Sequence, residues 1–114
     1  MKVLKDGFDL FLAMNRKEGE YQRAIDDASD VARAKAVGSA MAVLHISILV
    51  GSITFDRDFT EADMEGPREY ADRKERVAER YDDRENVEAW LARGRAEGAA
   101  WALQEIEKRM EEEP

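Results

Sequence analysis

The sequence contains no cysteine, only two prolines and a single histidine. A chain without cysteine has no disulfide framework, no thiolate metal site and no cysteine nucleophile. The single histidine, His45, excludes a metal site made of three histidines from one chain. Asp6 and Asp9 interrupt the apolar run that a signal peptide needs near the N-terminus, so we expect a cytoplasmic protein.

Charge is absent from one long stretch. Charged residues make up 39% of the chain, yet Ala36–Phe55 contains no Asp, Glu, Lys or Arg. Twenty such residues match the length of a transmembrane helix. Against a membrane span, His45 would lie near the bilayer centre, and Phe55 is the one aromatic anchor at either end. We therefore expect the core helix of a soluble protein, with a single-span membrane protein as the alternative.

Hydrophobic periodicity predicts helices around this stretch. Apolar residues recur with a 3.6-residue period from Tyr21 onward, and Gly38 weakens the helix by only about 1 kcal/mol. We predict one long central helix from about Glu18 to Leu49, packed against a C-terminal amphipathic helix over residues 87–110. A short N-terminal helix and a charged surface helix that begins at Pro67 complete an all-α bundle, a single helical domain of residues 1–114.

Two segments also fit a strand. Leu44–Phe55 alternates apolar and polar residues, as a strand with a bulge at Gly51 would. Asp6-Gly7 is a favoured hairpin dipeptide. We prefer helix in both places. Around Asp6-Gly7 the helical spacing accounts for more of the apolar residues, and a strand over Leu44–Phe55 would need partners that only residues 2–12 could supply.

The connections carry their own signals. Thr60 and Asp63 have the spacing of a capping box, which predicts a short helical turn after residue 60. Asp82 is a candidate cap for the last helix. Residues 111–114 are charged and predict a solvated tail.

Small residues suggest how the helices pack. Ala34, Gly38 and Ala42 recur every fourth position, and Gly94 and Gly98 repeat this spacing on the last helix. Small residues at this spacing allow two helix backbones to approach closely. The predicted residues for helix packing or a dimer interface are Ala34, Gly38, Ala42, His45, Gly94 and Gly98.

The predicted length of the central helix favours a homodimer. A helix of about 30 residues is roughly 45 Å long, and its neighbours in the chain are shorter. Two copies that share burial of this helix would remove the mismatch, and two-fold dimers are the commonest oligomers. His45 would then be a core or interface residue. Trp90 and Trp101 lie on one face of the last helix, where they are either core residues or anchors for a partner.

The net charge of −8 is unevenly distributed. Residues 1–35 carry seven basic and seven acidic side chains, so residues 56–114, with eleven basic and nineteen acidic, carry the whole excess. An acidic surface opposes direct binding of nucleic acid and attracts a basic protein surface. We predict a non-enzymatic interaction protein that binds or blocks such a partner, in the manner of phage anti-defence proteins that imitate phosphate charge.

Signatures of catalysis or cofactor binding are weak, so we predict neither an enzyme nor a cofactor. Asp56-Arg57-Asp58 opens like a calcium loop, but Glu61 stands where glycine is needed and Pro67 where a glutamate is needed. No phosphate loop or Gly-x-Ser-x-Gly motif occurs. The acidic pairs Asp27/Asp30 and Glu69/Asp72 resemble the carboxylate pairs of helical nucleotide hydrolases, so a magnesium-dependent hydrolase is the second alternative.

Overall fold

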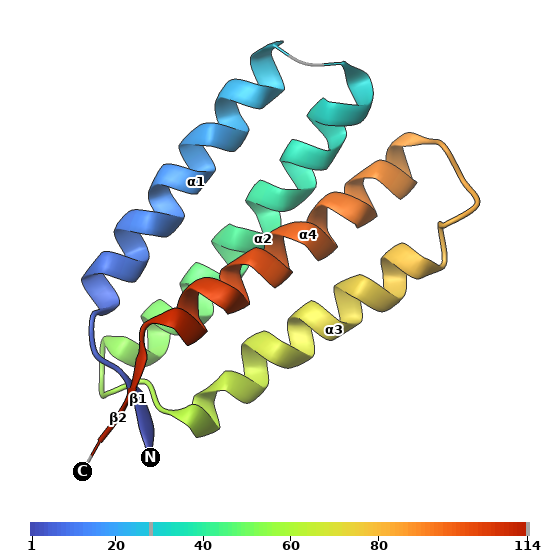
Figure 1. Ribbon diagram of the computed structural model, residues 1–114. Coiled ribbons are helices and arrows are strands. Elements are labelled where there is room, and N and C mark those ends of the chain that lie inside the picture. The colour runs from blue at the N-terminus through green and yellow to red at the C-terminus, as the bar shows by residue number, and fades with distance from the viewer. Residues whose placement is uncertain (28, 114) are drawn as a thin grey trace.

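Four helices form two hairpins in the computed structural model, which describes residues 1–27 and 29–113. The helices of this part are α1 (Gly7–Asp27), α2 (Asp30–Thr54), α3 (Glu65–Glu79) and α4 (Val87–Lys108). They follow one another across the molecule in the order α1, α2, α4, α3, so that α2 and α4 are central (Figure 1). The prediction of a small all-α bundle, with a central helix packed against the C-terminal amphipathic helix, is confirmed.

The single helix from Glu18 to Leu49 is wrong. α1 ends at Asp27 and α2 begins at Asp30, with Ser29 in an extended conformation as its N-cap. The Ser29 hydroxyl accepts a hydrogen bond from the Ala32 N–H, which satisfies one of the free donors at the helix start. Folding back as a hairpin lets the apolar stripes of the two helices bury one another, whereas one straight helix would leave them end to end.

The short N-terminal helix is also wrong, because α1 continues for 21 residues through Asn15 and Gly19. The Asp6 carboxylate accepts a hydrogen bond from the Asp9 N–H over 2.9 Å, so Asp6 starts the helix rather than a hairpin turn. Leu44–Phe55 is helical to Thr54, as preferred. α2 has 25 residues and is about 37 Å long, within the 49 Å extent of the molecule. The length mismatch that favoured a dimer therefore does not exist.

The two ends of the chain pair with each other. Strand β1 (Lys2–Leu4) runs antiparallel to β2 (Met110–Glu112), and Lys5 forms an ion pair with Glu113. Glu111 and Glu112 are exposed to solvent as predicted, but they belong to a paired strand rather than to a free tail, and Pro114 lies outside the described residues. A charged tail gives no hydrophobic periodicity, so the pairing left no signal in the sequence.

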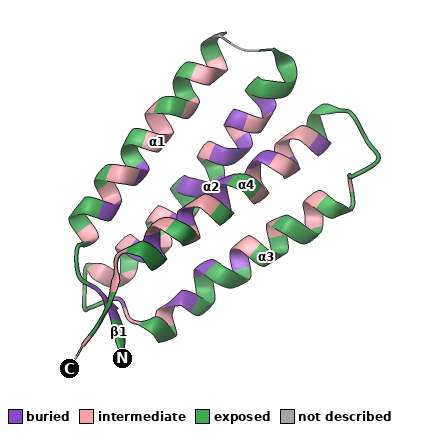
Figure 2. Ribbon diagram, in the orientation of Figure 1, coloured by how far each residue is buried: buried purple, intermediate pink, exposed green. Residues whose placement is uncertain are grey.

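The core lies along the α2–α4 contact and widens where the two chain ends meet. Figure 2 shows buried residues concentrated on α2 and α4, with α1 and α3 more exposed. The largest fully buried side chains of the core include Leu10, Met14, Ile46, Phe59, Met64 and Ile106. Phe59 and Met64 belong to the connection between α2 and α3, where the Phe59 carbonyl accepts a hydrogen bond from the Leu4 N–H. This connection therefore closes one end of the core.

The starts of η1, α3 and α4 can be compared with the capping signals in the sequence. The capping box of Thr60 and Asp63 is present and starts the 3₁₀ turn η1 (Glu61–Met64). α3 then begins at Glu65, before Pro67. The N-cap of α4 is Asn86, whose side chain accepts a hydrogen bond from the Ala89 N–H, so the assignment of this role to Asp82 is wrong.

Candidate functional site

The closest contact between helices lies where α2 crosses α4. A Cβ atom built on Gly38 would lie 2.3 Å from the Leu91 carbonyl oxygen, and one built on Gly98 would lie 2.5 Å from the Ser39 carbonyl oxygen. A Cβ on Gly94 would meet the Lys35 carbonyl oxygen at 2.2 Å. Real Cβ atoms do not occupy such positions, so only glycine permits this approach. Ala34 and Ala42 are buried beside it.

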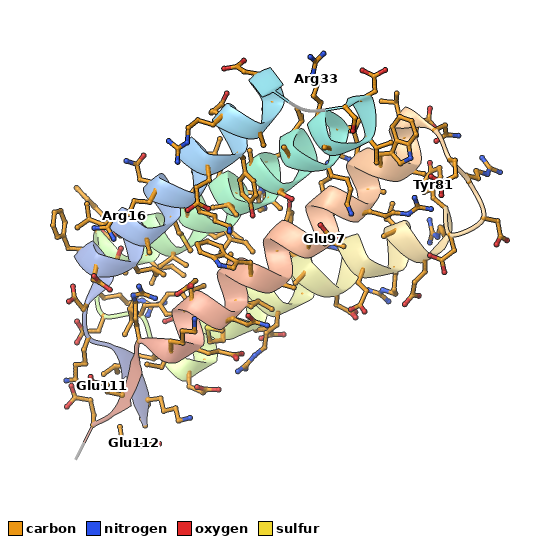
Figure 3. The ribbon with its side chains drawn as sticks, turned by 45° about the horizontal axis from the view of Figure 1, so that its top comes forward. Arg16, Arg33, Tyr81, Glu97, Glu111 and Glu112 are labelled. Carbon is orange, nitrogen blue, oxygen red and sulfur yellow. The ribbon has the colours of Figure 1, made fainter. Side chains whose placement is uncertain are left out.

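A polar pair fixes the register of this crossing. Ser39 is buried, and its hydroxyl donates a hydrogen bond of 2.9 Å to the Gly94 carbonyl oxygen. At its edge, Lys35 on α2 pairs with Glu97 on α4 at 3.2 Å; Figure 3 marks Glu97 on α4. The small residues predicted for helix packing therefore form a contact within one chain.

His45 is the exception among these residues. It lies exposed on α2, and its ring stacks on the Tyr70 ring of α3 with centroids 4.1 Å apart and planes 14° apart. The interpretation of His45 as a core residue is wrong for the single chain. Partial burial raises the pKa of the Tyr70 hydroxyl, and the Lys74 ammonium lies 5.1 Å from its ring. His45 thus marks the edge where α2 meets α3.

The two tryptophans are half-buried on α4 and make contacts within the chain. The Trp90 indole N–H donates to the Glu85 carboxylate over 3.1 Å, and this bond, with a smaller contribution from Arg93, lowers the pKa of Glu85. The Lys17 ammonium lies 5.4 Å from the Trp101 ring. Both rings therefore support the fold, whatever further contacts they make.

An apolar stripe on α2 remains exposed. Met41, Leu44 and Ile48 of α2 are 46%, 50% and 60% exposed. Val37, four residues before Met41, and the C-cap residue Phe55, seven residues after Ile48, extend this stripe at its two ends, so that it follows one side of the helix. Between Val37 and Phe55 this side of the helix carries no charged residue of its own. Arg33 ends the uncharged stretch four residues before Val37, and the Arg95 guanidinium of α4 donates a hydrogen bond of 3.8 Å to the Met41 sulfur.

The neighbouring surface of α1 continues the stripe. Phe8 and Leu12 are 75% and 39% exposed, and with Asn15 they line a shallow groove that Leu44 borders from α2. Gln22, seven residues after Asn15, lies on the same side of α1. We call these residues the uncharged face: Phe8, Leu12, Asn15 and Gln22 of α1, with Val37, Met41, Leu44, Ile48 and Phe55 of α2. Glu18 reaches the groove from α1, and its partial burial raises the pKa of its carboxyl group.

Carboxylates gather on another side of the molecule. Glu61 of η1 and Glu65, Glu69 and Asp72 of α3 surround a shallow groove, which we call the acidic groove. Its one basic residue is Arg68, which is paired with Glu61 at 3.1 Å and with Glu107 at 3.7 Å. Asp72 also pairs with Arg76 at 3.1 Å, so the excess of negative charge in the groove rests mainly on Glu65 and Glu69.

Further acidic residues lie at the end of the bundle where the chain termini meet. Glu111 and Glu112 lie on β2 there (Figure 3). In the nearby connection, Arg57 donates two hydrogen bonds of 2.7 Å to Asp63. These bonds, with a third of 2.8 Å from the Thr60 N–H, lower the pKa of Asp63 to about 2. Asp63 thus stays ionised and holds the connection closed.

Metal binding has no arrangement to support it in the part of the chain that the structure describes. No three His, Asp or Glu side chains converge there to hold an ion. Glu69 and Asp72 lie together on the acidic groove, whereas the Asp27 side chain lies outside the described residues. Among the described residues, no second pair of carboxylates therefore faces Glu69 and Asp72 from another helix, as the hydrolase alternative requires.

The length and composition of α2 also satisfy the requirements of a membrane span. Its most apolar 18-residue window has a mean hydropathy of 1.9, and 39% of that window is buried within the chain. A core helix satisfies the same criterion, so this observation alone does not distinguish the two.

Comparison of the chain with protein-family models, curated proteins and solved structures finds no match. Its function must therefore be argued from these surfaces.

Proposed function

We propose that this chain is a non-enzymatic interaction protein that binds a basic surface of a partner protein. The observation that carries the proposal is the acidic groove, where four carboxylates surround one arginine that is already paired. Lysine and arginine side chains of a partner would find the carboxylates of Glu65 and Glu69 there, beside Glu61 and Asp72, which are paired with Arg68 and Arg76 within the chain.

The placement of the carboxylates supports this function. Glu65, Glu69 and Asp72 lie three or four residues apart on one side of α3, so their attachment points are about 5–6 Å apart along the helix. A row of fixed negative charges at this spacing can attract a surface that normally binds phosphate groups. The chain would then block that surface, as a nucleic-acid mimic does. Direct binding of nucleic acid is disfavoured, because the net charge of −8 repels the phosphate backbone.

The homodimer predicted from the sequence remains part of the proposal, for a different reason. The length of the central helix no longer supports it, but the exposed uncharged face does, because monomeric proteins rarely expose large contiguous apolar patches. A membrane span is the competing explanation for that face. A magnesium-dependent hydrolase has no observation in its favour, so we do not propose it.

Neutralising the acidic groove tests the proposed function. The variant Glu65→Gln/Glu69→Gln/Asp72→Asn keeps the shape of the side chains and removes three charges. Proteins captured by the wild-type chain should be identified at low salt, and their binding should then be measured with purified components. We expect binding to weaken steeply as salt rises, because ions screen exposed charges beyond about 10 Å at 0.1 M, and the variant to lose it.

The matched control removes three charges elsewhere. Glu111→Gln/Glu112→Gln/Glu113→Gln changes the net charge by the same amount at the C-terminal strand, and we expect it to retain most of the binding. Binding that ignores salt, or equal losses in both variants, would contradict the acidic groove as the binding surface.

A further inference from the structure

We propose that a second copy of this chain covers the uncharged face, in a two-fold symmetric dimer that packs α1 and α2 of one copy against α1 and α2 of the other. The proposal deepens the homodimer part of the proposed function by naming its surface. It does not depend on the acidic groove, so each of the two surfaces can be tested without the other.

The first argument is the exposure of the face. Phe8, Leu44 and Ile48 are each at least half exposed, and Met41 and Leu12 lie beside them. Contact with another apolar surface stabilises such side chains by roughly 25 cal/mol for each Å² of apolar surface removed from water. Most other apolar residues of α2 are buried or half-buried, Val31 near its start being 40% exposed. The uncharged face is therefore the longest row of exposed apolar side chains on this helix.

The second argument is charge. Residues 1–55, which form β1, α1 and α2, carry seven basic and seven acidic side chains, so the half of the chain that bears the face is neutral. The other half carries the net charge of −8. Two copies therefore approach without net repulsion when their neutral halves face one another, while their acidic halves repel. A strongly charged partner gains nothing from this face.

The third argument is the pattern of the stripe. Val37, Met41, Leu44 and Ile48 are spaced by four, three and four residues, the alternation that lets two helices pack along a continuous seam. In a two-fold dimer each residue meets the same surface on the other copy, so one self-complementary stripe serves both chains.

The size of the face is the fourth argument. From Val37 to Phe55 it is about 27 Å long, and two neighbouring helices make it roughly 20 Å wide. The flat area is thus about 500 Å², and the accessible surface is larger because the side chains protrude. Specific interfaces bury roughly 800 Å² on each partner. The uncharged face therefore supplies more than half of the area that a specific dimer buries on each partner.

The test is the absolute mass in solution, measured by light scattering without detergent over a dilution series. We expect the wild-type chain at twice 13.0 kDa. The variant Ile48→Glu places a charge in the centre of the face. We expect the dissociation constant of its dimer to rise at least about 100-fold, which gives a mass near 13.0 kDa. The matched control is Val87→Glu, because Val87 is 56% exposed on α4, outside the face. We expect this control to remain a dimer.

Circular dichroism separates dissociation from misfolding. Ile48 is mostly exposed in the single chain, so its variant should keep the wild-type helix content; Met41→Lys provides a second variant at the same face. A monomeric wild-type chain, or Ile48→Glu and Met41→Lys proteins that both fold and stay dimeric, would overturn the proposal. Recovery of the wild-type chain only with detergent or membranes would also overturn it, since lipid would then cover the face.

Discussion

The Ser39 hydroxyl on α2 donates a hydrogen bond of 2.9 Å to the Gly94 carbonyl oxygen on α4. This bond joins the two hairpins at their closest contact, where Ser39 is the buried polar side chain of the core. A buried hydroxyl without a partner is costly, so the bond specifies which part of α4 lies against α2. The crossing of the two helices is therefore fixed by a few small residues.

Removing this hydroxyl should weaken the contact between the hairpins. We expect Ser39→Ala to lower the free energy of unfolding by about 1 kcal/mol, as measured by urea denaturation. Ser52→Ala is the control, because the exposed Ser52 hydroxyl bonds to Ile48 within its own helix. We expect this control to change stability by less than about 0.5 kcal/mol. Equal effects of the two substitutions would show that the interhelical bond contributes nothing.

The glycines of the crossing should tolerate no side chain. In Gly98→Ala the new methyl group would lie 2.5 Å from the Ser39 carbonyl oxygen, so the helices must separate. We expect a loss of about 2 kcal/mol or more, seen as a lower melting temperature. Gly66→Ala is the control, since no atom lies within 4 Å of the added position. We expect it to be neutral or stabilising, and a Gly98→Ala protein as stable as wild type would refute the close contact.

Asp63 should make stability depend on pH in the acid range. The pKa of Asp63 falls from 3.8 to about 2 on folding, chiefly through the hydrogen bonds from Arg57. The folded chain therefore binds fewer protons than the unfolded chain between these values. The resulting stabilisation is present above 3.8 and is lost as the pH falls through this range towards 2.

The variant Asp63→Asn should lack this stabilisation and its pH dependence. At neutral pH we expect its free energy of unfolding to be about 1–2 kcal/mol lower than that of wild type, since it lacks both the ion pair and the capping box. Below a pH of about 2, where Asp63 is protonated in the folded wild type as well, the two proteins should converge. The exposed Asp58→Asn is the control for a nearby lost charge. Denaturation curves that differ by the same amount at pH 2 and pH 7 would contradict this account.

The sequence predicted the fold class because long helices bury periodic stripes, and Gly38, Gly94 and Gly98 have the spacing of helix contacts. It missed the hairpin between α1 and α2, since the apolar period runs on through Ser29 and no proline or glycine marks the turn. Only the Ser29-Asp30 pair, a serine cap followed by an acidic first turn, was available as a signal.

The two candidate surfaces were predictable to different degrees. The uncharged stretch from Ala36 to Phe55 was evident, but the sequence does not tell which of its apolar side chains face solvent, because both sides of α2 are apolar. That distinction requires the positions of α1 and α4. The acidic groove depends on η1 and α3 lying together with Arg68 paired to Glu107, a contact between residues distant in the sequence.

One distance measurement tests the dimer face most directly. The chain has no cysteine, so Ser52→Cys allows a single spin label at the edge of the uncharged face. Packed helices lie 8–10 Å apart, so two such labels would lie within about 30 Å of one another in a dimer of either orientation. We predict a clear dipolar interaction by pulsed electron paramagnetic resonance, and a much weaker one for a label at Glu79→Cys on α3. No interaction from Ser52→Cys, or a stronger one from Glu79→Cys, would contradict the account.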